Sequence, residues 1–154
     1  MSGRSYSVVF TDIAITTAKT LIELIPATNK PIEIVGLEIG QTTDFGDTAD
    51  EILKLTITRG ATTTGTGTAA TPSPMSPSDA ASGFTAKVNM TAESTGGTEV
   101  VLWNSAYNIR AGYIQWFPEG MRPTSINGSL LLLKQSLPAD SVTFSGTLYV
   151  CELG

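Results

Sequence analysis

The chain has 154 residues, a formal net charge of −5, no histidine and a single cysteine. The absence of histidine excludes the Ser-His-Asp and Cys-His nucleophile systems and the usual zinc and iron ligand sets, and one cysteine excludes an intrachain disulfide. The nine basic residues are scattered singly along the sequence, so we expect neither a nucleic-acid partner nor binding to an anionic membrane surface.

The length fits a single domain over residues 1–154. With 41% hydrophobic and only 15% charged residues, the composition favours a folded chain over a disordered one. The apolar run Leu130–Leu133 is far too short to cross a bilayer, and no basic-then-apolar leader opens the sequence. We therefore expect no membrane partner and no secretory signal peptide.

Short runs of β-branched and apolar residues, separated by Gly, Pro, Asn and Asp, predict strands and almost no helix. The predicted strands are residues 6–15, 20–25, 32–40, 52–59, 84–90, 98–103, 112–117, 129–135 and 142–153. Because no helices separate them, the chain is predicted to be all-β, an antiparallel, jelly-roll-like β-sandwich of eight to nine strands. In the third strand the apolar phase changes around Gly36, which predicts a bulge.

Residues 60–83, between the fourth and fifth predicted strands, are rich in Thr, Pro and Gly and contain one charged residue, Asp79. Met75 is the only sizeable apolar side chain in this segment, so we expect a long loop without a core of its own. Pro72 and Pro74 favour an extended backbone. Two interpretations stay open: a mobile surface loop, or an arm that docks on a partner.

Three predicted strands are apolar on both faces: residues 100–103, 113–117 and 130–133. One face fits the core, and the other must be covered either by an extra layer of this chain or by another subunit. Since no helix is predicted to supply that layer, we favour another subunit. The interface candidates are Trp103, Tyr113, Trp116, Phe117, Leu131 and Leu133, with Pro72, Pro74 and Met75 of the long loop.

No motif predicts catalysis or cofactor binding. Gly60–Gly65 has the opening spacing of a phosphate-binding loop, but Thr66 stands where the lysine is required. The acidic cluster from Asp44 to Glu51 lacks the alternating ligands of a calcium loop. No two carboxylates are paired as a glycosidase requires. We therefore expect no enzyme, no cofactor and no metal site.

Several motifs resemble a known group of proteins. They are Lys30-Pro31-Ile32-Glu33-Ile34-Val35-Gly36, Asn108-x-x-x-Gly112-Tyr113, Trp116-Phe117-Pro118-Glu119-Gly120, Leu130-Leu131-Leu132 and Val142-Thr143-x-x-Gly146-Thr147. This order is similar to that of small virion structural proteins of tailed phages and prophages, which decorate or cement capsids as single-domain β-sandwiches or jelly rolls, often as trimers. Cys151 departs from the pattern, which is acidic at that point.

The resemblance implies a homo-oligomer, expected to be a trimer, that binds the major capsid protein or another virion protein. It implies a location in the virion after synthesis in the host cytoplasm. The aromatic residues Trp103, Tyr113 and Trp116 leave a different function open, a carbohydrate-binding β-sandwich module or a receptor-binding fibre component. These alternatives differ in whether a saccharide or a protein subunit covers the aromatic rings.

Overall fold

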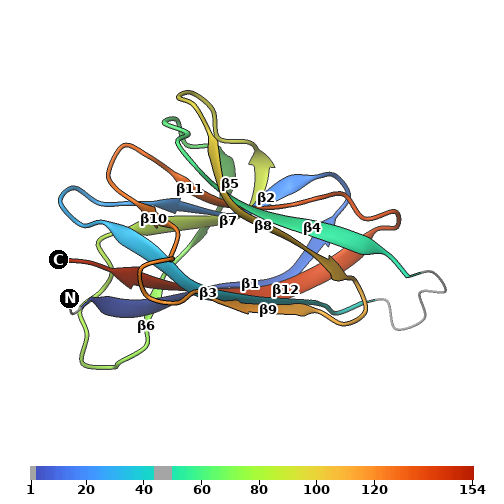
Figure 1. The fold of residues 1–154 in the computed structure, drawn as a ribbon, viewed down its shortest axis with the longest axis horizontal. Coiled ribbons are helices and arrows are strands. Elements are labelled where there is room, and N and C mark those ends of the chain that lie inside the picture. The colour runs from blue at the N-terminus through green and yellow to red at the C-terminus, as the bar shows by residue number, and fades with distance from the viewer. Residues whose placement is uncertain (1–2, 44–49) are drawn as a thin grey trace.

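The structure is a computed structural model that describes residues 3–43 and 50–154. In these residues there are twelve strands and no helix, and the strands form two antiparallel sheets packed face to face (Figure 1). The predicted β-sandwich is confirmed. The described part of the chain accordingly offers no helix that could cross a membrane.

One sheet, named sheet A here, has the strand order β10-β3-β12-β1-β6, and β9 also pairs with β3. Its strands are β1 (Arg4–Ile15), β3 (Ile32–Gln41), β6 (Ser73–Pro74), β9 (Tyr113–Trp116), β10 (Thr124–Ser125) and β12 (Val142–Glu152). The first long strand pairs with the last one, so β12 lies in the middle of the sheet between β1 and β3.

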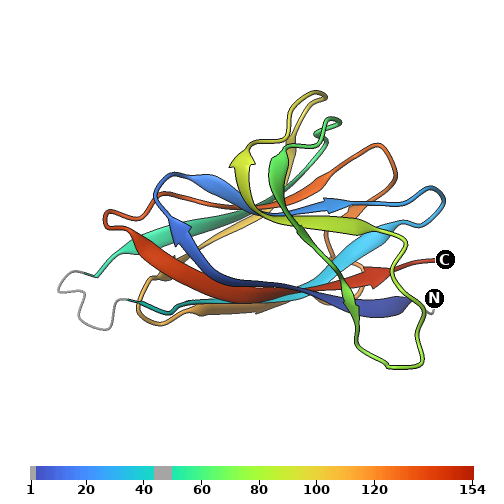
Figure 2. The same ribbon diagram turned by 180° about the vertical axis from the view of Figure 1, so that it is seen from behind.

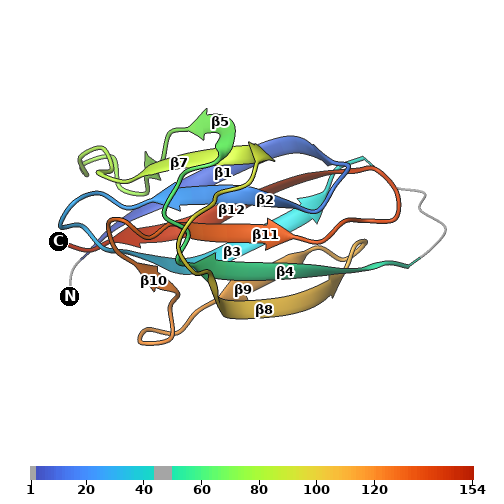
Figure 3. The same ribbon diagram turned by 90° about the horizontal axis from the view of Figure 1, so that it is seen from above.

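The other sheet, sheet B, has the order β5-β7-β2-β11-β4-β8 and is seen from above in Figure 3. Its strands are β2 (Lys19–Ile25), β4 (Ile52–Arg59), β5 (Thr66–Ala70), β7 (Thr85–Ala92), β8 (Val100–Asn108) and β11 (Leu131–Gln135). The edges of this sheet are β5 on one side and β8 on the other.

Side chains that point between the sheets form one continuous core. In β12, Val142, Phe144, Leu148 and Val150 are all at most 1% exposed, as their shared face in the sequence predicts. The predicted bulge in β3 is also present, because its register against β12 shifts at Val35. Burial of each large apolar side chain contributes about 1.5–3 kcal/mol, which makes this core the main source of stability.

The three strands that the sequence misses are β5, β6 and β10, so the described chain has twelve strands rather than eight or nine. Two of them lie in residues 60–83, where a long loop was expected. β5 pairs with β7, β6 pairs with Tyr6 and Ser7 of β1, and Pro72 is buried. Backbone hydrogen bonds to neighbouring strands hold this segment, although it has almost no apolar side chains to bury.

Two connections cross the outer face of sheet B, and we name them the straps. Residues 60–65 lead from β4 to β5, and residues 93–99 lead back from β7 to β8 (Figures 2 and 3). The straps run side by side, because Thr63 N donates to the Thr95 carbonyl at 2.8 Å and Thr95 N donates to the Thr63 carbonyl at 3.0 Å.

The straps are the extra layer that covers the second apolar face of β11. Leu131 and Leu133 point into the core and are 0% and 2% exposed, while Leu130 and Leu132 form a second cluster with Ala61 of the first strap. The prediction that Leu131 and Leu133 contact another subunit is therefore wrong. The strap sequences have no apolar periodicity, so their position over β11 could not be predicted from the sequence.

Candidate interaction surfaces

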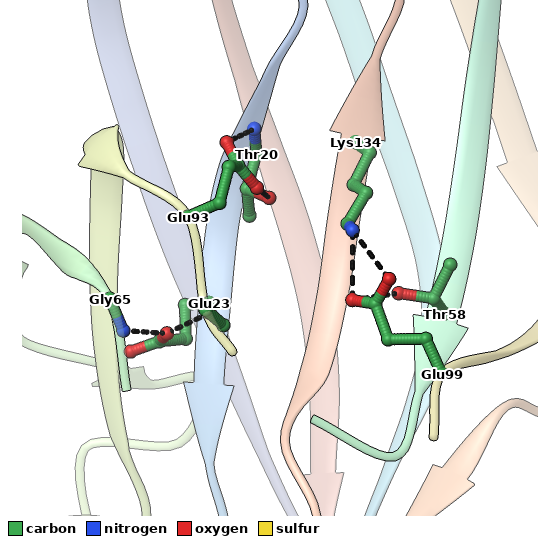
Figure 4. A network of polar contacts seen from close by, with 8 residues as sticks. Thr20, Glu23, Thr58, Gly65, Glu93, Glu99 and Lys134 are labelled. Carbon is green, nitrogen blue, oxygen red and sulfur yellow. Dashed lines mark hydrogen bonds and ion pairs between the residues drawn. The ribbon is translucent and has the colours of Figure 1, made fainter. Parts of the chain in front are cut away.

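Three glutamate carboxylates fasten the straps to sheet B, and one of them, that of Glu23, is buried (Figure 4). Glu23 is 0% exposed, and its Oε2 accepts hydrogen bonds from Gly65 N of one strap, at 2.9 Å, and from Ser94 Oγ of the other. Lys87 Nζ lies 3.8 Å from Glu23 Oε1 and donates to the Gly65 carbonyl at 2.8 Å. One charged group thus joins both straps, and a nearby cation compensates its charge.

The second strap has two further anchors, one near each of its ends. Glu93 accepts hydrogen bonds from Thr20 N, at 2.8 Å, and from the Thr20 hydroxyl. Glu99 accepts two hydrogen bonds of 2.8 Å from Lys134 Nζ and one of 3.4 Å from the Thr58 hydroxyl. Each of these carboxylates holds a strap against sheet B, so the network stabilises the fold.

Metal ligands are not gathered anywhere in residues 3–43 and 50–154, which hold no cluster of three or more suitable side chains. Asp44 and Asp47 of the acidic cluster considered as a calcium site lie outside the described residues. Asp50 forms an ion pair with Arg110 at 3.4 Å.

The outer face of sheet A, in contrast, is crossed by no other part of the described chain (Figure 1). One row of neighbouring residues on this face runs Val9, Thr147, Glu38, Ile114 across four strands. Its two ends, Val9 and Ile114, are 53% and 63% exposed. Large apolar side chains are therefore left in contact with water here.

The next row of sheet A carries an aromatic pair. Trp116 and Tyr149 flank Gly36, and their rings stack with centroids 5.0 Å apart and planes 26° from parallel. A Cβ atom on Gly36 would lie 2.3 Å from the Trp116 ring, so only glycine leaves room for the indole. Trp116 remains 55% exposed.

Tyr149 links the two rows of the outer face. Its hydroxyl donates to Glu38 Oε1 at 2.6 Å. This hydrogen bond, with smaller effects of burial and of the Glu38 charge, raises the pKa of Tyr149 above its ordinary value. The phenol therefore stays protonated, and the bond persists, at neutral pH.

A groove of about 470 Å³ lies along the row that contains Glu38. It forms where Gly40 provides no side chain, and Ser145 and Thr147 contribute hydroxyl groups to its lining. A Cβ atom on Gly40 would meet nothing within 4 Å, which shows that the groove is open above it. At Gly146 a Cβ atom would lie 2.3 Å from the Glu38 carbonyl oxygen, so this position must be glycine.

The edge strand β8 forms a second exposed surface. Its nine residues, VVLWNSAYN, include no charge, and Val100 and Val101 are 51% and 56% exposed. Among the described residues β9 pairs with β3 alone, so it is a second uncharged edge, but it has only four residues. The remaining strands at the sheet edges are protected in ways that natural proteins commonly use. β6 and β10 have two residues each, β5 is followed closely by Pro72, and β1 has a register shift beside Asp12, whose φ is 52°.

Beside β8, a groove of about 660 Å³ separates the edges of the two sheets. Trp103 lines it and packs edge to face on Phe117, with centroids 5.5 Å apart, and also contacts Tyr113 at 6.0 Å. Met121, which is 76% exposed, belongs to the same lining. This side of the sandwich therefore combines an open strand edge with apolar side chains.

The predicted interface residues thus divide into exposed and buried groups. Trp116, Pro74 and Met75 are exposed, and Trp103 and Tyr113 are partly buried. Phe117, Leu131, Leu133 and Pro72 are buried inside this chain. The sequence missed Tyr149 and Glu38 as neighbours of Trp116, because the pairing of β12 and β9 with β3 brings together residues far apart in the chain.

No family model matches the sequence, and comparison with curated proteins and with solved structures finds no match either. The function must therefore be inferred from the surfaces described above and from the motifs in the sequence.

Proposed function

We propose that this protein is a non-enzymatic structural protein of a phage virion, which decorates or cements the capsid as a homo-oligomer, expected to be a trimer. The motifs between Asn108 and Gly120 and in β12, which resemble those of small virion proteins, support this proposal. The observation that carries it is the open, uncharged edge of β8. Its proposed location is the virion, after synthesis in the host cytoplasm.

An unpaired strand edge presents a row of backbone donors and acceptors that another chain can pair with. In β8 this edge lies beside the exposed Val100 and Val101, so a second subunit gains apolar burial as well as hydrogen bonds. We place the contact between copies at β8 and the adjoining groove that holds Trp103 and Met121.

Binding to the capsid then follows from repetition. Many identical copies on a capsid, each with a modest contact, reach high overall avidity. The proposed partner is the major capsid protein or another virion protein. The exposed turn after β6, which carries Met75 with 57% of its surface exposed, is one of the surfaces available for that contact.

Light scattering of the purified chain tests self-association directly. The parent chain is expected to form an oligomer at tens of micromolar, roughly the concentration range of weak subunit contacts. Val101→Lys, which places a charge on β8, should give monomers. Val9→Lys is the matched control, because Val9 is the same residue type with similar exposure on the other sheet. A parent chain that is strictly monomeric would contradict the proposed contact.

The virion role has an independent test in the genome. Genes for a portal protein, a protease or a major capsid protein beside this gene would support the proposal. Purified virions should also contain the protein in many copies, as measured by mass spectrometry. Virions that lack it altogether would contradict a role in decoration.

A further inference from the structure

We infer that the outer face of sheet A binds a neutral carbohydrate, in the groove beside the Trp116–Tyr149 pair. This inference goes beyond the virion role and uses a surface different from the edge of β8. Three features of the described residues carry it: an exposed aromatic ring, a carboxylate next to it, and a groove with hydroxyl groups in its lining.

The aromatic feature suits the apolar side of a sugar ring. Carbon-bound hydrogens of a saccharide pack on an aromatic ring, whose face is electron-rich. Trp116 is 55% exposed at the end of the edge strand β9, on the uncovered outer face of sheet A, and contact with Tyr149 holds its indole in place. Because Gly36 leaves room for the ring, its position is set before a ligand arrives, which lowers the entropic cost of binding.

The polar features suit sugar hydroxyls. Tyr149 occupies only Oε1 of Glu38, and the other carboxylate oxygen accepts no hydrogen bond from the described residues. Glu38, Thr11, Ser145 and Thr147 all line the groove. The carboxylate accepts hydrogen bonds, and the hydroxyl side chains both donate and accept them, which matches the dual character of sugar hydroxyls.

Size and charge narrow the ligand class. The groove volume of about 470 Å³ falls within the range of small-molecule sites, about 300–1,000 Å³. Glu38 is the one charged residue in its lining, so anionic ligands are repelled. An aromatic cage for a quaternary ammonium needs rings that enclose a space, whereas Trp116 and Tyr149 stack on one another. A neutral, hydroxyl-rich ligand is the best complement.

Fluorescence titration of the full chain with maltose, cellobiose and lactose, together with a glycan array, tests the inference. We expect a saturable change for at least one neutral saccharide. Trp116→Ala should weaken its affinity about tenfold or more, since loss of an aromatic contact and its buried area is worth about 1.4 kcal/mol. Ile126→Ala, at an exposed apolar residue outside the groove lining, is the matched control and should change nothing.

A second variant tests the groove itself. Gly40→Leu adds a side chain where the backbone leaves open space, so the chain should fold with an unchanged melting temperature. The leucine should fill the groove and abolish saccharide binding while the aromatic pair stays intact. Loss of binding in both variants supports the site. If Gly40→Leu fails to fold, the titration of Trp116→Ala alone tests whether saccharide binding depends on this site.

Three results would overturn the inference. The first is the absence of any saccharide response in titration and array. The second is binding that persists in both Trp116→Ala and Gly40→Leu. The third is saturable binding of tetramethylammonium with no saccharide binding, which would assign a cation site instead. None of these results bears on self-association, which light scattering of the same variants reports separately.

Discussion

The outer faces of the two sheets carry similar side chains, but only that of sheet B is covered by other residues of the described chain. On sheet B, Leu132 and Glu23 lie beneath two straps and are 0% exposed. On sheet A, Ile114 and Trp116 are 63% and 55% exposed, and the Glu38 carboxylate accepts a single hydrogen bond from the described residues. Each outer face therefore combines large apolar side chains with a carboxylate. The two faces differ in that only the face of sheet B is covered by straps.

This difference shows how to distinguish a structural carboxylate from one available for binding. The partners of Glu23 come from both straps and from Lys87: its Oε2 accepts two hydrogen bonds, and its charge is paired with a cation of the same chain. The partner of Glu38 is one neighbour on the same open face. Groups that the straps cover contribute to the free energy of unfolding. Groups on the uncovered face contribute little to it and stay accessible from solvent.

The largest expected effect separates the apolar groups of the two faces. Leu132→Ala should destabilise the protein by about 2–5 kcal/mol, because it leaves a cavity under the straps. Ile114→Ala should change the free energy of unfolding by at most about 0.5 kcal/mol, since its side chain is already in water. Urea unfolding measures both. Equal effects would show that the two faces do not differ as described.

A second comparison sets a buried anchor of the straps against a more exposed one. Glu23→Ala leaves Gly65 N and Ser94 without their acceptor and should cost about 1–3 kcal/mol. Glu99→Ala breaks the pair with Lys134, in which both side chains are about one-third exposed, and should cost about 0–1 kcal/mol. Thermal unfolding of both variants measures the two losses of stability. A larger fall in melting temperature for Glu99→Ala than for Glu23→Ala would refute the role assigned to Glu23.

A third prediction concerns the glycine beneath the aromatic pair. Gly36→Ala places a methyl group against the Trp116 ring and should displace it, with a cost of about 1 kcal/mol because the exposed ring can move aside. Near-ultraviolet circular dichroism should report the lost stacking. Gly40→Ala, where the added methyl group meets nothing, should leave the spectrum unchanged.

The smallest expected effect is on pH dependence. Because the folded-state pKa of Tyr149 is raised, its contribution to stability is fully present below the ordinary tyrosine pKa of about 10 and is lost as pH rises through the folded value. Tyr149→Phe should therefore lessen the decline of melting temperature between about pH 9 and 11. An identical decline in parent and variant would show that the bond to Glu38 does not favour the protonated phenol.

Local patterns in the sequence were sufficient for nine of the twelve described strands but not for β5, β6, β10 or the straps. Runs of apolar and β-branched residues bounded by turn residues predict β12 and eight other strands, because each such signal is contained within a few consecutive residues. A strap is held instead by backbone hydrogen bonds and by Glu23, far from Gly65 in the sequence. No local pattern in a Thr/Gly-rich segment carries that information.

The aromatic site was predicted in part for the same reason. Trp116 lies in a predicted strand that is apolar on both faces, and this pattern alone predicts that it is available for an interface. Its neighbours Tyr149 and Glu38 depend on the register of three strands that are distant in sequence. Register is set by the whole sheet, so these neighbours become visible only once the sheet is assembled.

The place of β12 in the middle of sheet A has a consequence for synthesis on the ribosome. Until Val142–Glu152 has emerged, β1 and β3 lack the strand that joins them, and β11 between β2 and β4 is also made late. Neither sheet can close before these strands are available, so the sandwich completes only after β12 has left the ribosome. Nascent chains carry open apolar edges throughout that interval, which exposes them to aggregation and to chaperones.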